Sequence, residues 1–187
     1  EGDEPILQNT SLEQYNIIYD FSMDYSHPIK ETLLFETGYD LNTRNLTNTF
    51  SSMSYNYEDV LWQEDPDLNN QFLYFQQINA LYANVTGKWT RFSFMGGLRA
   101  EYIKTAQNEV DTDEYLDLFP SANISTKINK YNTVYAAYTR RINRPTIKML
   151  NPYTDEYADV LNQHRGNPDL KPEYVNTLEI GHRYSGD

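Results

Sequence analysis

Apolar and polar residues alternate along much of the chain with the period of two that is typical of β-strands. In residues 15–25 every second position is apolar or aromatic, at Tyr15, Ile17, Tyr19, Phe21, Met23 and Tyr25. Polar side chains fill the positions between them, except at Ile18. Residues 90–103 alternate just as clearly, so both stretches are predicted to form strands with one apolar face.

The same pattern predicts about seven long strands, which together form one structural unit that covers residues 1–187. Their ranges are 15–25, 31–41, 72–86, 90–103, 117–128, 133–143 and 174–184. Residues 1–14 are polar and acidic, which predicts a loop or frayed terminus. No stretch has the period of a helix of normal length. The fold class is therefore all-β, an antiparallel up-and-down meander.

The connections between these strands alternate in length. Residues 42–70, 104–115 and 144–173 are predicted to be long polar connections, whereas the turns near Ser26, Gly87 and Asn129 are short. Alternate connections of a meander lie at opposite ends, so the short turns share one rim and the long loops the other. This arrangement is typical of bacterial outer-membrane barrels. Eleven residues, rising about 3.3 Å each and tilted by about 45°, cover an apolar band of about 25 Å.

A soluble β-sandwich is the alternative architecture. Soluble strands average about 5 to 6 residues, however, and sandwiches favour Greek-key connections over regular meanders. The pattern therefore favours part of a transmembrane β-barrel.

Composition narrows the possible partners and chemistry. The net charge of −12 argues against nucleic acid as the main partner, because phosphate binding uses clustered Lys and Arg. The chain has no Cys, which excludes disulfides and thiolate sites. Its 17 Tyr residues suit half-buried strands and the boundary between water and an apolar phase.

The stretch from Tyr138 to Gly181 runs from strand through loop to strand, and four prolines interrupt its middle. Each Pro lacks a backbone donor, and the Asn-Pro pairs at 151–152 and 167–168 favour turns. Its position between two full-length strands predicts an outward-facing connection at the long-loop rim.

Three segments, in this order, are similar to motifs of one family. They are GLRAEY at 97–102, DLFPSANISTKIN at 117–129, and YTRRINRP followed by LNPY and GNPDLKPEYVNTLEIG. Together they resemble the C-terminal barrel region of TonB-dependent outer-membrane receptors. The resemblance covers residues 70–184 well and the first hairpin more loosely.

Membership would imply a barrel of about 22 strands with a plugged lumen, in the outer membrane of a Gram-negative bacterium. The expected partners are outer-membrane lipid, the remaining barrel and plug, TonB, and an imported siderophore, vitamin or glycan. Nothing in the chain resembles the plug domain or a TonB-contact box, so the chain is interpreted as a fragment of the receptor.

Candidate ligand contacts lie at the predicted long-loop rim: Trp62, Tyr153, Tyr157, Arg141 and Arg144. The aromatic rings have the shape to stack on a sugar ring or siderophore, although ordinary loop packing explains them equally well. For the arginines, bonds to loop carboxylates and carbonyls are favoured over contacts with anionic lipid.

No residue pattern indicates catalysis, a cofactor or a metal. The three His residues have no ligand spacing. Residues 64–69 begin like a calcium loop but lack its Gly, and Gln76 replaces its final Glu. The acidic group at Asp111, Asp113, Glu114 and Asp117 is interpreted as a solvated loop.

Two hypotheses follow, and both are non-enzymatic. The first is a fragment of a TonB-dependent receptor barrel, and the alternative is a secreted or surface-exposed soluble β-sheet binding module. Burial of one large apolar side chain is worth about 1.5–3 kcal/mol. We therefore expect the isolated fragment to self-associate, close through its own edges or bind detergent, whereas light scattering from a detergent-free monomer would favour the alternative.

Overall fold

The chain forms a single antiparallel sheet in a computed structural model that describes residues 5–66, 68–108, 111–153 and 165–186. Its elements are β1 (Gln8–Lys30), β2 (Leu33–Asn56), β3 (Leu61–Glu64), β4 (Asn70–Lys88), β5 (Phe92–Gln107), β6 (Asp111–Lys127), β7 (Asn132–Asn143), α1 (Ile147–Leu150) and β8 (Glu173–Tyr184). The long strands pair in chain order, and the short β3 pairs with β2. The predicted all-β meander is confirmed. Among the described residues, no helix is both long and apolar enough to cross a membrane.

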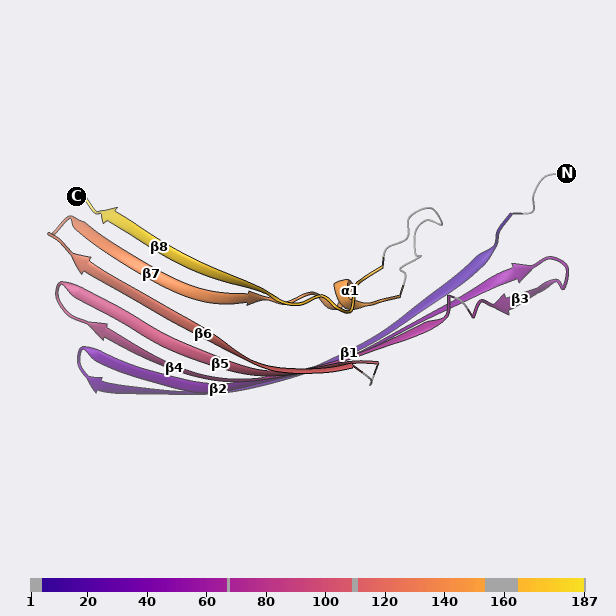
Figure 1. Ribbon diagram of the computed structural model, residues 1–187, viewed down its shortest axis with the longest axis horizontal. Helices are drawn as coiled ribbons and strands as arrows, with labels where there is room; N and C mark the ends of the chain where they lie inside the picture. The colour runs from indigo at the N-terminus through magenta and orange to yellow at the C-terminus, as the bar shows by residue number, and fades with distance from the viewer. Residues whose placement is uncertain (1–4, 67, 109–110, 154–164, 187) are drawn as a thin grey trace.

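Short turns and long connections lie at opposite ends of the sheet, as predicted. Figure 1 shows the β1–β2, β4–β5 and β6–β7 turns at one end and the connections from β2 to β4, β5 to β6 and β7 to β8 at the other. Two successive long strands therefore bring the chain back to the rim from which it started.

Several strands are longer than the sequence pattern predicted. β1 begins at Gln8, inside the segment expected to be a loop, and β2 continues to Asn56 through the polar stretch expected to be a connection. The β5–β6 ladder likewise extends to the Gln107–Asp111 pair, inside the predicted 104–115 connection. Ladder hydrogen bonds use the backbone, so a strand continues where both of its faces are polar and apolar alternation no longer marks it.

The convex face of the sheet is apolar over the part nearest the short turns. Register places one apolar set from successive strands on this face, and its members beyond β1 include Leu81, Leu98, Leu116, Leu118, Ile124, Leu178 and Ile180. Leu178 is 73% exposed and Ile180 is 79% exposed. Such a band matches the lipid-facing surface of a transmembrane barrel.

Aromatic residues gather at the short-turn end of this band. The Trp89 ring lies 5.9 Å from the Phe92 ring and 5.8 Å from the Phe94 ring, centroid to centroid, and Tyr131 lies 6.2 Å from Tyr184. Aromatic girdles of this kind mark the membrane interface in outer-membrane barrels.

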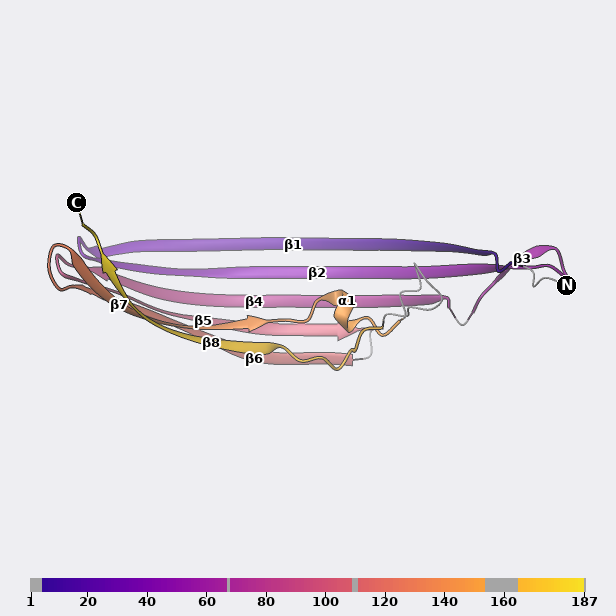
Figure 2. The ribbon, with the colours of Figure 1, turned by 90° about the horizontal axis from the view of Figure 1, so that it is seen from above.

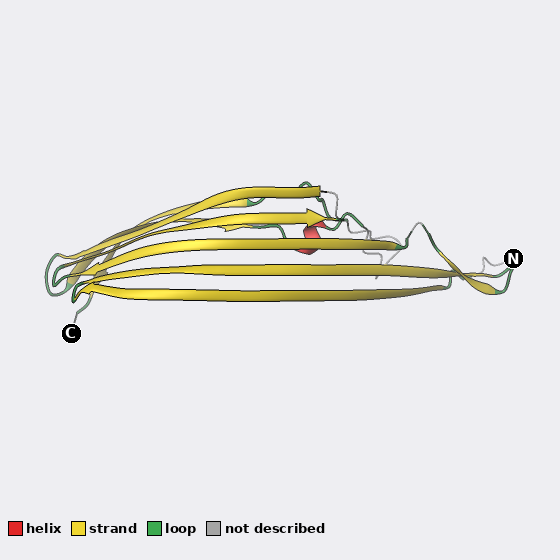
Figure 3. Ribbon diagram, turned by 90° about the horizontal axis from the view of Figure 1, so that it is seen from below, coloured by secondary structure: helices red, strands yellow, loops and turns green. Residues whose placement is uncertain are grey.

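The sheet is curved but open (Figures 2 and 3). Within the described residues, β1 pairs only with β2, and β8 pairs only with β7. The outer edges of β1 and β8 therefore present unpaired backbone groups.

Candidate functional site

Charged and polar side chains line the concave face of the sheet. Arg99 on β5 donates to Asp40 on β2 over 2.5 Å and to Glu101 over 2.7 Å. Nearer the short turns, the Tyr82 hydroxyl donates to Asp24. The strands are thus apolar outward and polar inward, as in a barrel with a hydrated lumen.

The connection between β7 and β8 folds back onto this concave face. We call its described residues, 144–153 and 165–172, the strap; Figure 1 shows α1 lying on the concave side of the sheet. The prediction of an outward-facing connection is therefore wrong for these residues. β7 ends at Asn143, and Pro145, which lacks a backbone donor, prevents the strand from continuing. The strap begins between them, at Arg144.

Arg144 anchors the start of the strap. Its Nη2 donates to Glu101 Oε2 over 2.5 Å, and Glu101 is only 7% exposed. Glu101 therefore pairs with two guanidinium groups, those of Arg99 and Arg144. A buried carboxylate requires such partners, because an unpaired buried charge is costly.

An apolar contact at α1 holds the strap against the sheet. Leu150 is 7% exposed and packs with Leu46 of β2 and with Phe72 and Tyr74 of β4. Because α1 has only four residues and no side-chain N-cap bond, it depends on this packing. Burial raises the pKa of the Tyr74 phenol above its usual value, so the hydroxyl stays protonated near neutral pH.

The two limbs of the strap pair closely with each other. Gly166 N donates to Asn151 O over 2.9 Å, and Asn167 N donates to Met149 O over 2.7 Å. A Cβ at Gly166 would lie 2.5 Å from Asn151 O, so this position requires Gly. Asn167 Oδ1 accepts from Asp169 N, which closes the following turn. The GNPD part of the motif thus shapes the strap.

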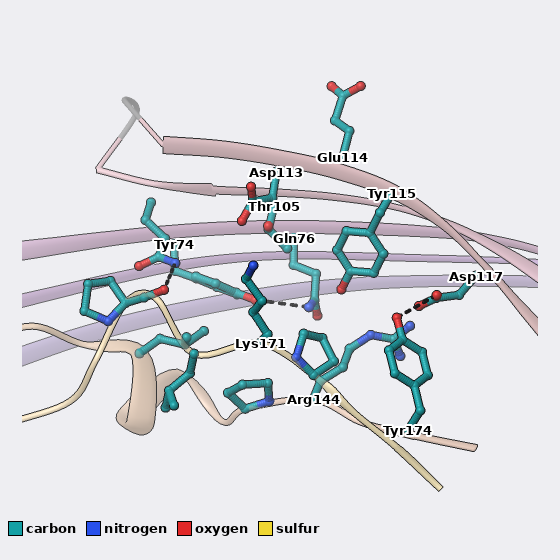
Figure 4. A pocket seen from close by; sticks show the side chains of 16 residues that line it. Tyr74, Gln76, Thr105, Asp113, Glu114, Tyr115, Asp117, Arg144, Lys171 and Tyr174 are labelled. Carbon is teal, nitrogen blue, oxygen red and sulfur yellow. Dashed lines mark hydrogen bonds between the residues drawn. The ribbon is translucent and has the colours of Figure 1, made fainter. Parts of the chain in front are cut away.

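A pocket of about 430 Å³ lies between the strap and the wall formed by β4, β5 and β6. Its wall residues include Tyr74, Gln76, Thr105, Gln107, Asp113, Tyr115 and Asp117, and its strap residues include Arg144, Pro145, Leu150, Pro168, Leu170, Lys171 and Pro172 (Figure 4). Tyr174 of β8 completes the lining, and its hydroxyl donates to Asp117 Oδ1 over 2.7 Å. The volume is within the usual range for small-molecule sites.

The ladder between β6 and β7 explains why the pocket opens here. It ends at the Ser121–Thr139 pair, whereas the β7–β8 ladder continues to Asn143–Glu173. The earlier part of β6 therefore has no ladder partner on its β7 side in the described structure. Its inward side chains face the strap instead.

Several polar atoms around the pocket lack protein partners. Among the described residues, Asp117 Oδ2, Gln107 Oε1 and Arg144 Nε are buried without a hydrogen bond. Such atoms are unusual in folded proteins and often mark functional positions. They supply two acceptors and one donor.

The structure separates the five predicted contact residues. Arg144 lines the pocket, and Tyr153 packs against the Leu150 cluster. Arg141 lies on the concave face nearer the short turns, where it lines a second pocket of about 420 Å³ together with Arg99. Trp62 on β3 packs 5.4 Å from the Tyr55 ring and does not line the main pocket. Tyr157 lies outside the described residues.

Sequence reasoning missed most of the wall. Asp113 and Asp117 were assigned to a solvated loop, but both belong to β6 and line the pocket, and Asp117 is buried. Their spacing with Tyr115, at alternate positions, was the available signal for one strand face. No group of three or more His, Cys, Asp or Glu residues suited to hold a metal occurs in the part of the chain that the structure describes.

The solved structures that share this fold include two transporters. Ferric citrate transporter FecA, in its unliganded form, matches with a TM-score of 0.59 and 14% identity over 95% of this chain and 26% of its own. Copper transporter OprC matches with a TM-score of 0.57 and 14% identity over 96% of this chain and 29% of its own. The chain therefore spans less than a third of either transporter, and at this identity the likeness concerns the fold.

A search of curated proteins found no match to the sequence. The model of the outer membrane protein beta-barrel family matches residues 1–187. The full-length match agrees with the apolar convex face, the polar concave face, and the short turns at one rim and long connections at the other. The chain accordingly belongs to the outer membrane protein beta-barrel family.

Proposed function

We propose that this chain forms part of the barrel wall of a TonB-dependent receptor that imports a small solute. The chain is an outer-membrane protein of a Gram-negative bacterium. The proposal adds a role in energised import, and it rests on the sequence motifs of that receptor class and on the pocket beneath the strap. The proposed role is non-enzymatic.

The observation that carries the proposal is a strap seated on the inner face of an open wall. The pocket lies on the concave side, between wall and strap, at the rim of the long connections. A solute that entered a closed barrel from this rim would meet the pocket before the lower lumen. Arg144 is the predicted contact residue best placed to touch it.

The open edges of β1 and β8 fit a wall that other strands complete. A closed barrel satisfies every backbone group, as the membrane interior demands. We therefore expect the full-length receptor to supply the remaining strands and a plug. A soluble binding module, the alternative, would leave the convex apolar band in water, and the family match weighs against it.

The test is solute uptake by living cells. Depletion of solutes from a defined medium would be compared between cells with and without the full-length receptor, each with and without TonB. We expect at least one solute whose uptake requires both proteins. A full-length protein without a plug domain, or solute uptake that is the same in all four strains, would refute the proposal.

A further inference from the structure

Two opposite charges face the pocket from different sides and remain unpaired. Among the described residues, the side chains of Asp113 on β6 and Lys171 on the strap have no hydrogen bond or ion pair, although both line the pocket. Figure 4 shows Lys171 extending from the strap toward the wall that carries Asp113. The charges of Arg144 and Glu101, by contrast, are already paired.

The wall concentrates acceptors along one strand. Asp113, Tyr115 and Asp117 are alternate residues of β6 and share its concave face, opposite Thr105, Ile103 and Glu101 of β5. Four residues of strand span about 13 Å, so two carboxylates flank one aromatic ring over that distance. The unbonded Oδ2 of the buried Asp117 adds an acceptor without a donor.

The opposite side of the pocket offers a cation and apolar surface. Lys171 supplies an ammonium group, and Leu150, Leu170 and Pro172 supply apolar contacts. Glu114, the next acidic residue of β6, does not compete for this cation. Glu114 also belongs to the pocket lining, but its carboxylate is bonded to Lys104 over 2.9 Å and points away from the other labelled side chains in Figure 4.

We propose that this pocket binds a short zwitterionic peptide. The peptide's ammonium group binds the β6 carboxylates, with Asp113 as its main partner, and its carboxylate binds Lys171 of the strap. Three residues in an extended chain span about 10 Å, so a tripeptide is the probe that we test. The inference rests on the proposed import function and names the substrate class of that site.

The test uses three probes that differ only at their ends. Binding of trialanine, N-acetyl-trialanine and trialanine amide to the full-length receptor in detergent would be measured by isothermal titration calorimetry. We expect trialanine to bind and each blocked peptide to bind about fivefold or more weakly, the effect of one lost, partly solvated ion pair.

Two variants assign each end of the peptide to its residue. Asp113→Asn should abolish the discrimination against the acetylated peptide, and Lys171→Gln the discrimination against the amide. Both side chains are exposed, so the variants should fold normally. Lys88→Gln, at the short-turn rim, is the matched control and should leave all three affinities unchanged.

Absence of trialanine binding, equal binding of the three probes, or unchanged discrimination in both variants would overturn the inference. If TonB-dependent uptake of another solute persisted in that case, only the peptide assignment would fail. If receptor-dependent uptake were also absent, the import function would fail with it.

Discussion

The seat of Leu150 controls the position of the strap, and Leu150→Ala tests this directly. Among the described strap residues in the apolar cluster, only Leu150 is buried, with 7% of its surface exposed. Truncation of a buried Leu to Ala costs about 2–5 kcal/mol. We take about 2–3 kcal/mol, because a strap can withdraw from the wall without leaving a full cavity. That loss corresponds to about a 30- to 150-fold shift in the ratio of seated to unseated strap.

The strap position can be measured by electron–electron double resonance. The chain contains no Cys, so spin labels at Met149→Cys on the strap and Ser51→Cys on β2 add the only thiols to it. Met149 is 51% exposed, so a label there leaves the apolar cluster intact. We expect one narrow distance distribution in the parent pair. In Leu150→Ala, a broad component should appear and grow.

Leu170→Ala is the matched control for this experiment. Leu170 lies in the same strap and lines the same pocket, but it is 38% exposed and outside the cluster. Its truncation should leave the distance distribution narrow. If Leu150→Ala gave the same narrow distribution as Leu170→Ala, the apolar seat would not hold the strap, and the reasoning would be refuted.

Three further predictions concern the strap and the wall. Gly166→Ala should separate the two limbs, because the new Cβ would meet backbone carbonyl oxygens at 2.5 and 2.6 Å. Hydrogen–deuterium exchange should show lost strap protection, whereas Gly96→Ala, with no atom within 4 Å, should not change it. Arg144→Gln should weaken seating by about 1.5–3 kcal/mol, the value of a charged hydrogen bond, seen as a broader spin-label distribution; an unchanged distribution would contradict the anchor. In outer-membrane vesicles, a polar maleimide should label Glu179→Cys on the inward face but not Ile180→Cys on the lipid face, and the reverse result would invert the wall.

The membrane part of the fold was predictable because one face of each strand contacts lipid. Alternation at Tyr15–Tyr25 and along 90–103 reports this contact directly, and the structure exposes the apolar set on the convex face. Above the apolar band polar side chains occur on both faces and apolar ones no longer alternate regularly, so the signal vanishes while the ladder continues. For this reason the upper half of β2, to Asn56, was predicted to be a loop.

The candidate site was less predictable, because it depends on contacts between distant segments. Arg144 and Glu101 are 43 residues apart, and nothing in the local pattern of either indicates that they pair. Nor does the Pro-rich composition of the strap reveal its direction. That direction depends on Leu150 meeting Leu46 and Phe72, which tertiary packing alone determines.

Because the pocket has one side on the wall and the other on the strap, ligand affinity and strap position should share one equilibrium. A ligand that contacts both sides binds only the seated form, so its apparent Kd equals the intrinsic Kd divided by the seated fraction. If Leu150→Ala lowers that fraction to about one tenth, the apparent Kd for trialanine should rise about tenfold. Saturating trialanine should then restore the narrow spin-label distribution, since a ligand stabilises the state it binds. A weaker affinity without this restoration would mean that Leu150 acts only through its own contact with the peptide, and the proposed coupling between strap and ligand would be wrong.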